Sequence, residues 1–174
     1  GNQSLTIYDD AGQVSATVDP LGNRTTNQYD GSGNRTTTID ANGKVWTSVF
    51  ASDSNRLSVS VDPLGNRTSY TYDKAGQRTA VQNARGFRTT NSFDGAGRLI
   101  TVIDALLNIS SYGYDSAGRQ TSMTNALGKI WKTGYDSVGR PVTFTTPLGF
   151  ISTNTYDAVG QQTEHIDALG NTAT

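Results

Sequence analysis

The chain has 174 residues, a formal net charge of −1 and no cysteine. The balanced charge argues against a nucleic-acid-binding surface and against a polybasic segment that inserts at a membrane, and the absence of cysteine excludes a disulfide framework and thiol chemistry. Hydrophobic residues make up only 34% of the chain, whereas Gly occurs 19 times and Tyr 8 times. This composition favours β-strands and turns, with little apolar material for a core.

One aromatic position recurs about every 21 residues along the sequence. It is occupied by Tyr8, Tyr29, Phe50, Tyr72, Phe93, Tyr114, Tyr135 and Tyr156. A fixed period of this length indicates a repeat protein. We therefore expect residues 1–174 to form a single continuous array of eight repeats, either an excerpt of a longer array or a unit that assembles with copies of itself.

In seven of the eight units an Asp follows the aromatic residue, and a Gly follows the Asp three positions later. These pairs are Asp9 and Gly12, Asp30 and Gly33, Asp73 and Gly76, Asp94 and Gly97, Asp115 and Gly118, Asp136 and Gly139, and Asp157 and Gly160. The Asp side chain can cap its own turn, and the Gly can take the left-handed conformation that closes a three-residue hairpin loop. We interpret both residues as structural.

A second turn of the same kind falls half a unit later, as in Asp62-Pro63-Leu64-Gly65. Two of the sixteen turns lack the Gly and place Asn55 or Leu107 there. Asn tolerates the left-handed conformation, whereas Leu is predicted to be strained. The alignment of the repeats places the start of the degenerate loop before Asn55 at Ser52. Separately, Pro141 is expected to interrupt a strand or mark a bulge.

The six or seven residues between turns are enough for short strands and too few for ordinary helices. The sequence thus predicts an all-β meander of antiparallel hairpins, with two strands per repeat, in a curved sheet. Fourteen of the fifteen aromatic residues lie at alternate positions of the strands that lead into the opening aromatic, so they share one face. Only Phe144 belongs to the other type of strand. Because one ring recurs per repeat, we expect these rings to form a stabilising ladder opposite a Thr-rich face.

These residues carry a family resemblance over the whole chain. The pattern Tyr-Asp-x-x-Gly-Arg/Gln/Asn, followed half a unit later by Asp-Pro/Ala-Leu-Gly-Asn, resembles the RHS or YD repeat. The segments closest to that pattern are Phe93-Asp94-Gly95-Ala96-Gly97-Arg98, Tyr114-Asp115-Ser116-Ala117-Gly118-Arg119 and Tyr135-Asp136-Ser137-Val138-Gly139-Arg140.

The resemblance implies a strip of hairpins that spirals into a hollow shell, as in bacterial polymorphic toxins, insecticidal toxin complexes and teneurin-type adhesion proteins. It also implies a secreted or cell-surface bacterial location and, in the toxins, an enclosed C-terminal cytotoxic domain. Some family members cleave themselves with Asp residues of a terminal stretch. The comparable Asp19-Pro20-Leu21-Gly22 reads as an ordinary repeat turn, so no protease residue is carried over.

Other readings of the polar and aromatic residues are weaker. One Asp per turn is explained by capping, no loop has the dense oxygen spacing of a calcium site, and His165 is the only histidine, without a recognisable nucleophile motif. We therefore expect no cofactor, no metal and no catalytic residue. Regularly spaced aromatic rings could also bind glycans or partner proteins, which leaves an adhesion or carbohydrate-binding module as the alternative.

The favoured hypothesis is a non-enzymatic wall that encloses space, either as a toxin shell or as a self-assembled extracellular tube or filament. A sheet of this width should have exposed edge strands unless something covers them. The expected partners are further repeats of the same chain or further copies of it at those edges, together with an enclosed toxin domain.

Overall fold

The computed structural model describes residues 3–173, and the repeat assignments of Gly1, Asn2 and Thr174 lie outside this range. The described residues form strands and turns without a helix, which confirms the all-β prediction, and they accordingly contain no helix able to span a membrane. The chain divides into two compact units, Gly1–Arg88 and Thr89–Thr174, and each is considered by itself.

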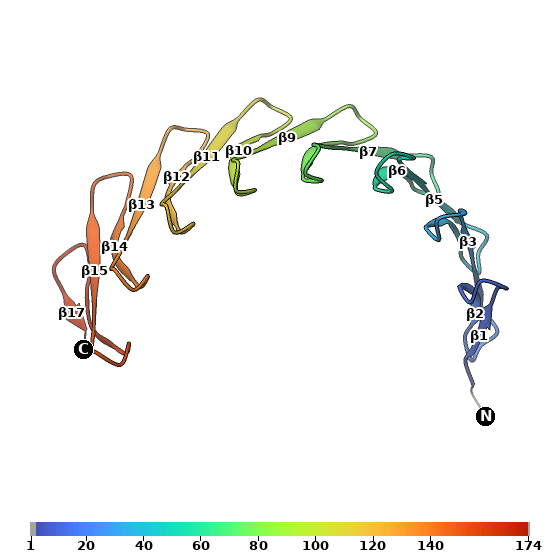
Figure 1. Cartoon of the computed structure of the whole chain (residues 1–174), viewed down its shortest axis with the longest axis horizontal. Coiled ribbons are helices and arrows are strands. Elements are labelled where there is room, and N and C mark those ends of the chain that lie inside the picture. Colours follow the sequence, from blue (N-terminus) through green and yellow to red (C-terminus); the bar gives the residue numbers. More distant parts are fainter. Residues whose placement is uncertain (1–2, 174) are drawn as a thin grey trace. The chain divides into compact units, whose positions relative to one another are not determined.

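The first unit is a meander of antiparallel strands in which each strand pairs with the next. Its strands are β1 (Leu5–Tyr8), β2 (Val14–Val18), β3 (Arg24–Tyr29), β4 (Arg35–Ile39), β5 (Val45–Phe50), β6 (Leu57–Val61), β7 (Arg67–Tyr72) and β8 (Arg78–Gln82). The strip of hairpins bends along its length (Figure 1).

The second unit repeats this arrangement, beginning at the boundary strand β9 (Arg88–Phe93). It continues with β10 (Leu99–Ile103), β11 (Ile109–Tyr114), β12 (Gln120–Thr124), β13 (Ile130–Tyr135), β14 (Pro141–Thr145), β15 (Ile151–Tyr156), β16 (Gln162–Ile166) and β17 (Thr172–Ala173). This strip also bends along its own length (Figure 1).

Each turn is closed by two backbone hydrogen bonds. In the loop from Asp136 to Arg140, the Gly139 N–H donates to the Asp136 carbonyl at 3.1 Å and the Asp136 N–H donates to the Arg140 carbonyl at 3.0 Å. Gly139 has φ +94°, which a residue with a Cβ adopts only with strain. The loop therefore depends on Gly at this position.

Among the described strands, every turn that comes directly after a repeating aromatic residue is followed by a β-bulge. In β13 and β14, for example, Tyr135 pairs with Pro141 whereas Gly134 pairs with Thr143, so Val142 is the extra residue. The expected bulge at Pro141 is therefore confirmed, but it belongs to the repeat and does not depend on proline. The same shift occurs between β3 and β4 and between β7 and β8.

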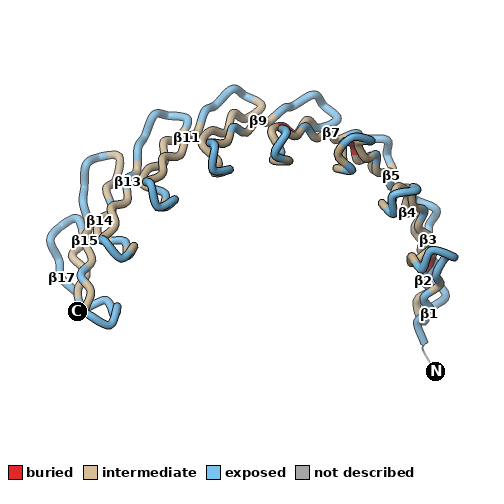
Figure 2. Tube along the Cα trace, viewed as in Figure 1, coloured by how far each residue is buried: buried red, intermediate tan, exposed pale blue. Residues whose placement is uncertain are grey.

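The strand register assigns side chains to the two faces of each strip. Trp131 lies opposite Met123, and Phe144 lies opposite Thr133, so Phe144 shares the aromatic face although it stands in the other type of strand. The opposite face contains the few buried residues of the first unit, Ala16, Val59 and Ala80. Figure 2 shows strands of intermediate exposure between exposed turns. Among residues 3–173, neither unit has a second layer that could cover a conventional core.

Close packing on this second face also restricts residue size in the second unit. Gly113 lies opposite Ser122, and Gly134 lies opposite Thr143. A Cβ added to either glycine would collide with the hydroxyl oxygen of the facing residue. Small residues therefore allow the hydroxyl-bearing partner to lie flat against the sheet.

The degenerate turn corrects one detail of the sequence alignment. Its first residue is Ala51 and not Ser52, because the Ala51 N–H donates to the Arg56 carbonyl and the Asn55 N–H donates to the Ala51 carbonyl, both at 2.8 Å. The alignment was wrong because it required a side-chain cap, whereas this longer loop closes through backbone bonds alone. Asn55 has φ +53° and Leu107 has φ +64°, so both take the predicted left-handed conformation.

The strain at Leu107 can be tested by replacement with Gly. L107G should stabilise the protein by about 1 kcal/mol, because Gly adopts a positive φ without a Cβ clash. The neighbouring L106G is the matched control and should give no gain, since Leu106 is outside the left-handed region. Thermal unfolding followed by circular dichroism would measure both, and equal midpoints for L107G and the parent chain would contradict the prediction.

Candidate functional site: the clamp between neighbouring repeats

In seven of the eight repeats, the Asp that follows the aromatic residue holds its own loop with one carboxylate oxygen. Asp136 Oδ1 accepts the Val138 N–H at 3.0 Å and the Arg140 N–H at 2.8 Å. Asp9, Asp30, Asp94, Asp115 and Asp157 each accept the same two backbone groups, and Asp73 accepts the second of them. The second carboxylate oxygen remains available for a side chain.

In five repeats the opening tyrosine reaches back to the preceding repeat. Tyr135 Oη donates to the Gln120 carbonyl at 2.9 Å, and Tyr156 Oη donates to the Pro141 carbonyl at 2.9 Å. Equivalent bonds join Tyr29 to Val14, Tyr72 to Leu57 and Tyr114 to Leu99. Each acceptor directly precedes the bulged residue, so the hydroxyl binds a carbonyl at the place where the strand ladder is interrupted.

An arginine completes the connection in the second unit. Arg119 Nε donates to Asp115 Oδ2 at 2.7 Å, while its Nη1 donates to the carbonyl of Asp136 in the next repeat at 3.1 Å. The same guanidinium lies 4.8 Å from the centre of the Tyr135 ring. One side chain thus binds its own loop, the next loop and the next aromatic ring.

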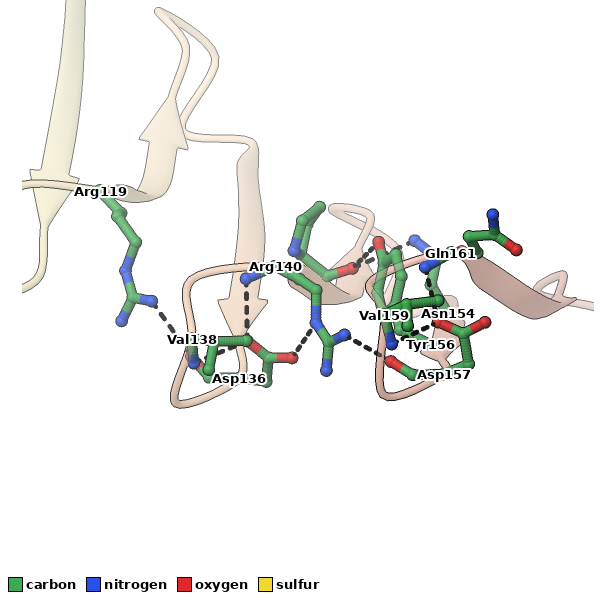
Figure 3. A network of polar contacts seen from close by, with 10 residues as sticks. Arg119, Asp136, Val138, Arg140, Asn154, Tyr156, Asp157, Val159 and Gln161 are labelled. Atoms are coloured by element: carbon green, nitrogen blue, oxygen red, sulfur yellow. Dashed lines mark hydrogen bonds and ion pairs between the residues drawn. The ribbon is translucent and has the colours of Figure 1, made fainter.

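This set of contacts, which we call the clamp, recurs at Arg98, Arg119 and Arg140. Figure 3 shows the Arg140 guanidinium between Asp136 of its own loop and Asp157 of the following one. Arg98 and Arg140 also lie 4.8 Å from the ring centres of Tyr114 and Tyr156. The geometry is the same in all three cases.

The first unit has amide side chains or an arginine at the same position, and their contacts differ from those of the clamp. Gln13 Nε2 donates to the Gly33 carbonyl at 3.3 Å, and Asn34 binds the side chain of Asn55. Arg56 lies 5.9 Å from the centre of the Tyr72 ring. Gln13 and Asn34 directly follow the Gly of their turns, and Arg56 directly follows Asn55. Each of the three contacts the next repeat.

Sequence reasoning recorded Arg, Gln or Asn after the turn Gly but assigned no role to that position. The sequence does offer a signal for such a role, because this position always carries a long or amide side chain that can donate hydrogen bonds. What the sequence could not indicate was the direction of these donors, toward the following repeat. The aromatic residues were predicted as a ladder, and the contacts found for five of the tyrosines are hydroxyl-to-carbonyl bonds and cation–π contacts.

Hydrogen bonds lower the pKa of several of the turn aspartates. The side-chain bond from Arg98, the Arg98 backbone N–H and the nearby guanidinium charge lower the pKa of Asp94. Backbone N–H bonds from Arg119 and Arg140 are the main causes that lower the pKa of Asp115 and Asp136, with the guanidinium contacts adding to them. In the other type of turn, the Asn23 side-chain amide is the main cause that lowers the pKa of Asp19.

The remaining candidate for chemistry is His165. Its Nδ1 lies 2.7 Å from Asn154 Oδ1, and Asn154 Nδ2 donates to the Pro141 carbonyl at 3.2 Å. His165 therefore extends the hydrogen bonds around the tyrosine hydroxyl of that repeat. Within residues 3–173 no cluster of His, Asp and Glu has the grouping needed to hold a metal ion.

Each unit also has a shallow hollow beside a tryptophan on the aromatic face. One, of about 300 Å³, is lined by Gln120, Ser122, Met123, Trp131, Thr133 and Phe144. The other, of about 410 Å³, is lined by Arg35, Thr36, Thr37, Thr38, Trp46 and Ser48. Both hollows could accept a small ligand.

The comparisons with known proteins agree with this geometry. The RHS Repeat family matches residues 8–45, 52–89, 93–130 and 135–172. The chain belongs to the RHS Repeat family. No curated protein matches the sequence. The resemblance to the RHS or YD repeat is confirmed.

Solved structures of low sequence identity share the fold of this RHS array. TcdB2-TccC3-TEV is 16% identical with a TM-score of 0.62, and the alignment covers 98% of this chain and 11% of that one. TcdB2-TccC3 is 14% identical with a TM-score of 0.55, and the alignment covers 95% of this chain and 12% of that one. The RHS chain thus spans about a ninth of the length of these structures.

The lowered pKa values predict a specific response to acid. A carboxylate with a depressed pKa stabilises the folded state above its unfolded pKa of about 3.9, and this contribution disappears as pH falls through the folded value. The midpoint of thermal unfolding should therefore stay level near neutrality and fall steeply below about pH 4.

A variant with Asn in place of the three clamp aspartates removes the carboxylate charge and keeps the side-chain cap of the loop. The triple variant D94N, D115N and D136N keeps a side-chain oxygen for the loop, as Asn83 and Asn125 do in their own turns. It loses the carboxylate charge, so its midpoint should depend less on pH below about 4 than that of the parent chain. Identical acid profiles for the two proteins would contradict the assignment.

Proposed function

We propose that this RHS chain is a non-enzymatic segment of a protein wall that encloses space, and that the enclosed space holds a polypeptide cargo such as a toxin domain. The observation that supports this proposal is the clamp. At Arg98, Arg119 and Arg140 the arginine binds the next loop and the next aromatic ring, and the tyrosine of that next repeat binds the preceding strand. The polar side chains of these turns therefore hold successive repeats of the sheet together.

The family resemblance supports the same reading. RHS repeats imply shells around cytotoxic domains, and the bending of each strip is the local geometry that a closed wall needs. The eight aromatic residues and seven Asp and Gly pairs named above act in this proposal as structural joints of one array. A secreted or cell-surface location follows as part of the proposal, because an enclosed toxin acts on other cells.

Negative-stain electron microscopy of the purified protein tests this function. The expected images show curved, walled particles with an unfilled interior, formed by copies that join into shells, tubes or filaments. A uniform population of small monomers across the accessible concentrations would contradict a wall built from this chain alone. A closed shell and an open filament are distinguishable in the same images.

The tryptophan hollows favour a second candidate function, the binding of carbohydrate on the aromatic face. Trp46 and Trp131 are half-exposed and stand at the same position of their repeats. Flat indole rings stack on the apolar faces of sugars, while neighbouring Thr, Gln and Arg side chains can bind hydroxyl groups.

Alanine substitution discriminates between the two roles of these tryptophans. If they bind ligand, W46A and W131A should abolish retention on a glycan array while the circular dichroism spectrum and unfolding midpoint stay close to those of the parent chain. If the rings serve only the sheet, the parent chain itself should bind no glycan, and both variants should lower the midpoint.

A further inference from the structure

The two tryptophan hollows are built from equivalent positions of their repeats. Each tryptophan lies opposite a residue of the preceding strand, Thr38 for Trp46 and Met123 for Trp131. Three further lining positions correspond, occupied by Arg35, Thr37 and Ser48 in the first hollow and by Gln120, Ser122 and Thr133 in the second. A comparison of the two hollows therefore shows what individual side chains contribute.

Of the two hollows, the one beside Trp46 has a charged residue in its lining, the exposed Arg35. Within residues 3–173 the Arg35 guanidinium has neither an ion-pair partner nor a hydrogen-bond partner. The Asp of its own loop is engaged by another side chain, since Asn34 Nδ2 donates to Asp30 Oδ2 at 3.0 Å. In the clamp repeats an arginine takes that carboxylate, but Arg35 stands one position later in its repeat. Arg35 is therefore free to bind an anion at the hollow.

Two more hydrogen-bond donors of this hollow have no partner among the described residues. They are the indole N–H of Trp46, a residue that is 40% exposed, and the hydroxyl of Ser48. Thr38 donates its hydroxyl to Asn27 Oδ1 at 3.2 Å, which leaves its oxygen as an acceptor. The hollow thus combines an exposed aromatic ring, hydrogen-bonding groups of both kinds and one unpaired cation.

This combination matches the chemistry of a sugar that carries a carboxylate. The apolar face of a sugar ring stacks on an indole ring, and its hydroxyl groups both donate and accept hydrogen bonds. A planar guanidinium binds a carboxylate through two parallel N–H bonds. An acidic peptide side chain would use the guanidinium alone, whereas a carboxylated sugar uses the cation, the ring and the hydroxyl groups together.

We propose that the hollow beside Trp46 binds a carboxylated sugar of the uronic acid type, with the sugar ring on Trp46 and the carboxylate on Arg35. The inference rests on carbohydrate binding, the second candidate function, and narrows it to one hollow and one class of sugar. Arg35 determines the specificity, because Gln120 at the equivalent position carries no charge. Met123, in the place of Thr38, also removes a hydroxyl group from the other hollow.

Biolayer interferometry with two immobilised glycans tests this specificity. The glycans share one backbone and end in glucuronic acid or in glucose, so that they differ only in the carboxylate. The parent chain should bind the glucuronic acid glycan roughly tenfold more tightly, as expected for a hydrogen bond between charged groups at a partly exposed site. R35Q introduces the residue that Gln120 already places at this position, and it should bind the two glycans equally.

R24Q is the matched control for R35Q. Arg24 is also exposed and belongs to the same unit, but it shares the opposite face of the strip with Ala16 and Thr26. The control removes the same charge and should keep the tenfold preference, while both variants keep the circular dichroism spectrum of the parent chain. An equal loss of preference in R24Q and R35Q would mean that net charge alone retains the acidic glycan, which overturns the assignment to Arg35.

The second hollow allows the reciprocal experiment. Q120R and M123T together place the side chains of Arg35 and Thr38 at the equivalent positions beside Trp131. Combined with R35Q, these two substitutions should restore the preference for glucuronic acid. A chain that still binds the two glycans equally would contradict a specificity set by the arginine.

The remaining outcomes separate this inference from the function on which it rests. Equal binding of both glycans by the parent chain would refute the carboxylate specificity and leave carbohydrate binding standing, whereas binding of neither glycan would refute both. A polyglutamate peptide, added as a competitor, should not displace the glucuronic acid glycan at equal charge concentration. Displacement from the parent chain would assign the hollow to an acidic polypeptide and overturn the sugar as its ligand.

Discussion

The structure depends on the constraint that a single-layer sheet has no interior in which to bury a core. Among the described residues only Ala16, Val59 and Ala80 are buried hydrophobics, and all three are small or medium in size. Burial of apolar area, the usual dominant stabilising term, is therefore limited. Stability must come from contacts repeated along the strip, in which each repeat is held by its neighbours.

The bulge and the turn supply those contacts together. The bulge interrupts the strand ladder beside Gln120 and Pro141, and their carbonyls accept the hydroxyls of Tyr135 and Tyr156 from the next repeat. The turn presents an Asp whose second oxygen fixes an arginine over that same tyrosine. Irregularities of the sheet thus become the places where successive repeats are joined, which explains why they recur with the repeat.

Local features of the fold were predictable from the sequence because they are set by residues close together in the chain. The hairpin loops follow from Asp and Gly at fixed spacing, the left-handed Leu107 follows from a missing Gly, and the alternation of side chains follows from strand geometry. Ala51 was missed because its loop closes through the backbone. The direction of Arg119 was missed because its partners, Tyr135 and Asp136, lie one repeat away and are fixed only by strand pairing and by the bulge.

The most direct test of the central claim is a double-mutant cycle between Arg119 and Tyr135. Substituting R119A and Y135L singly and together, with unfolding by chemical denaturant, should give a coupling free energy of about 0.5–1 kcal/mol, as expected for a cation–π contact near the surface. The pair Arg119 and Tyr156, separated by one further repeat, should be additive. Additive effects for Arg119 and Tyr135, or equal coupling for the two pairs, would contradict a sheet held together repeat by repeat through the clamp.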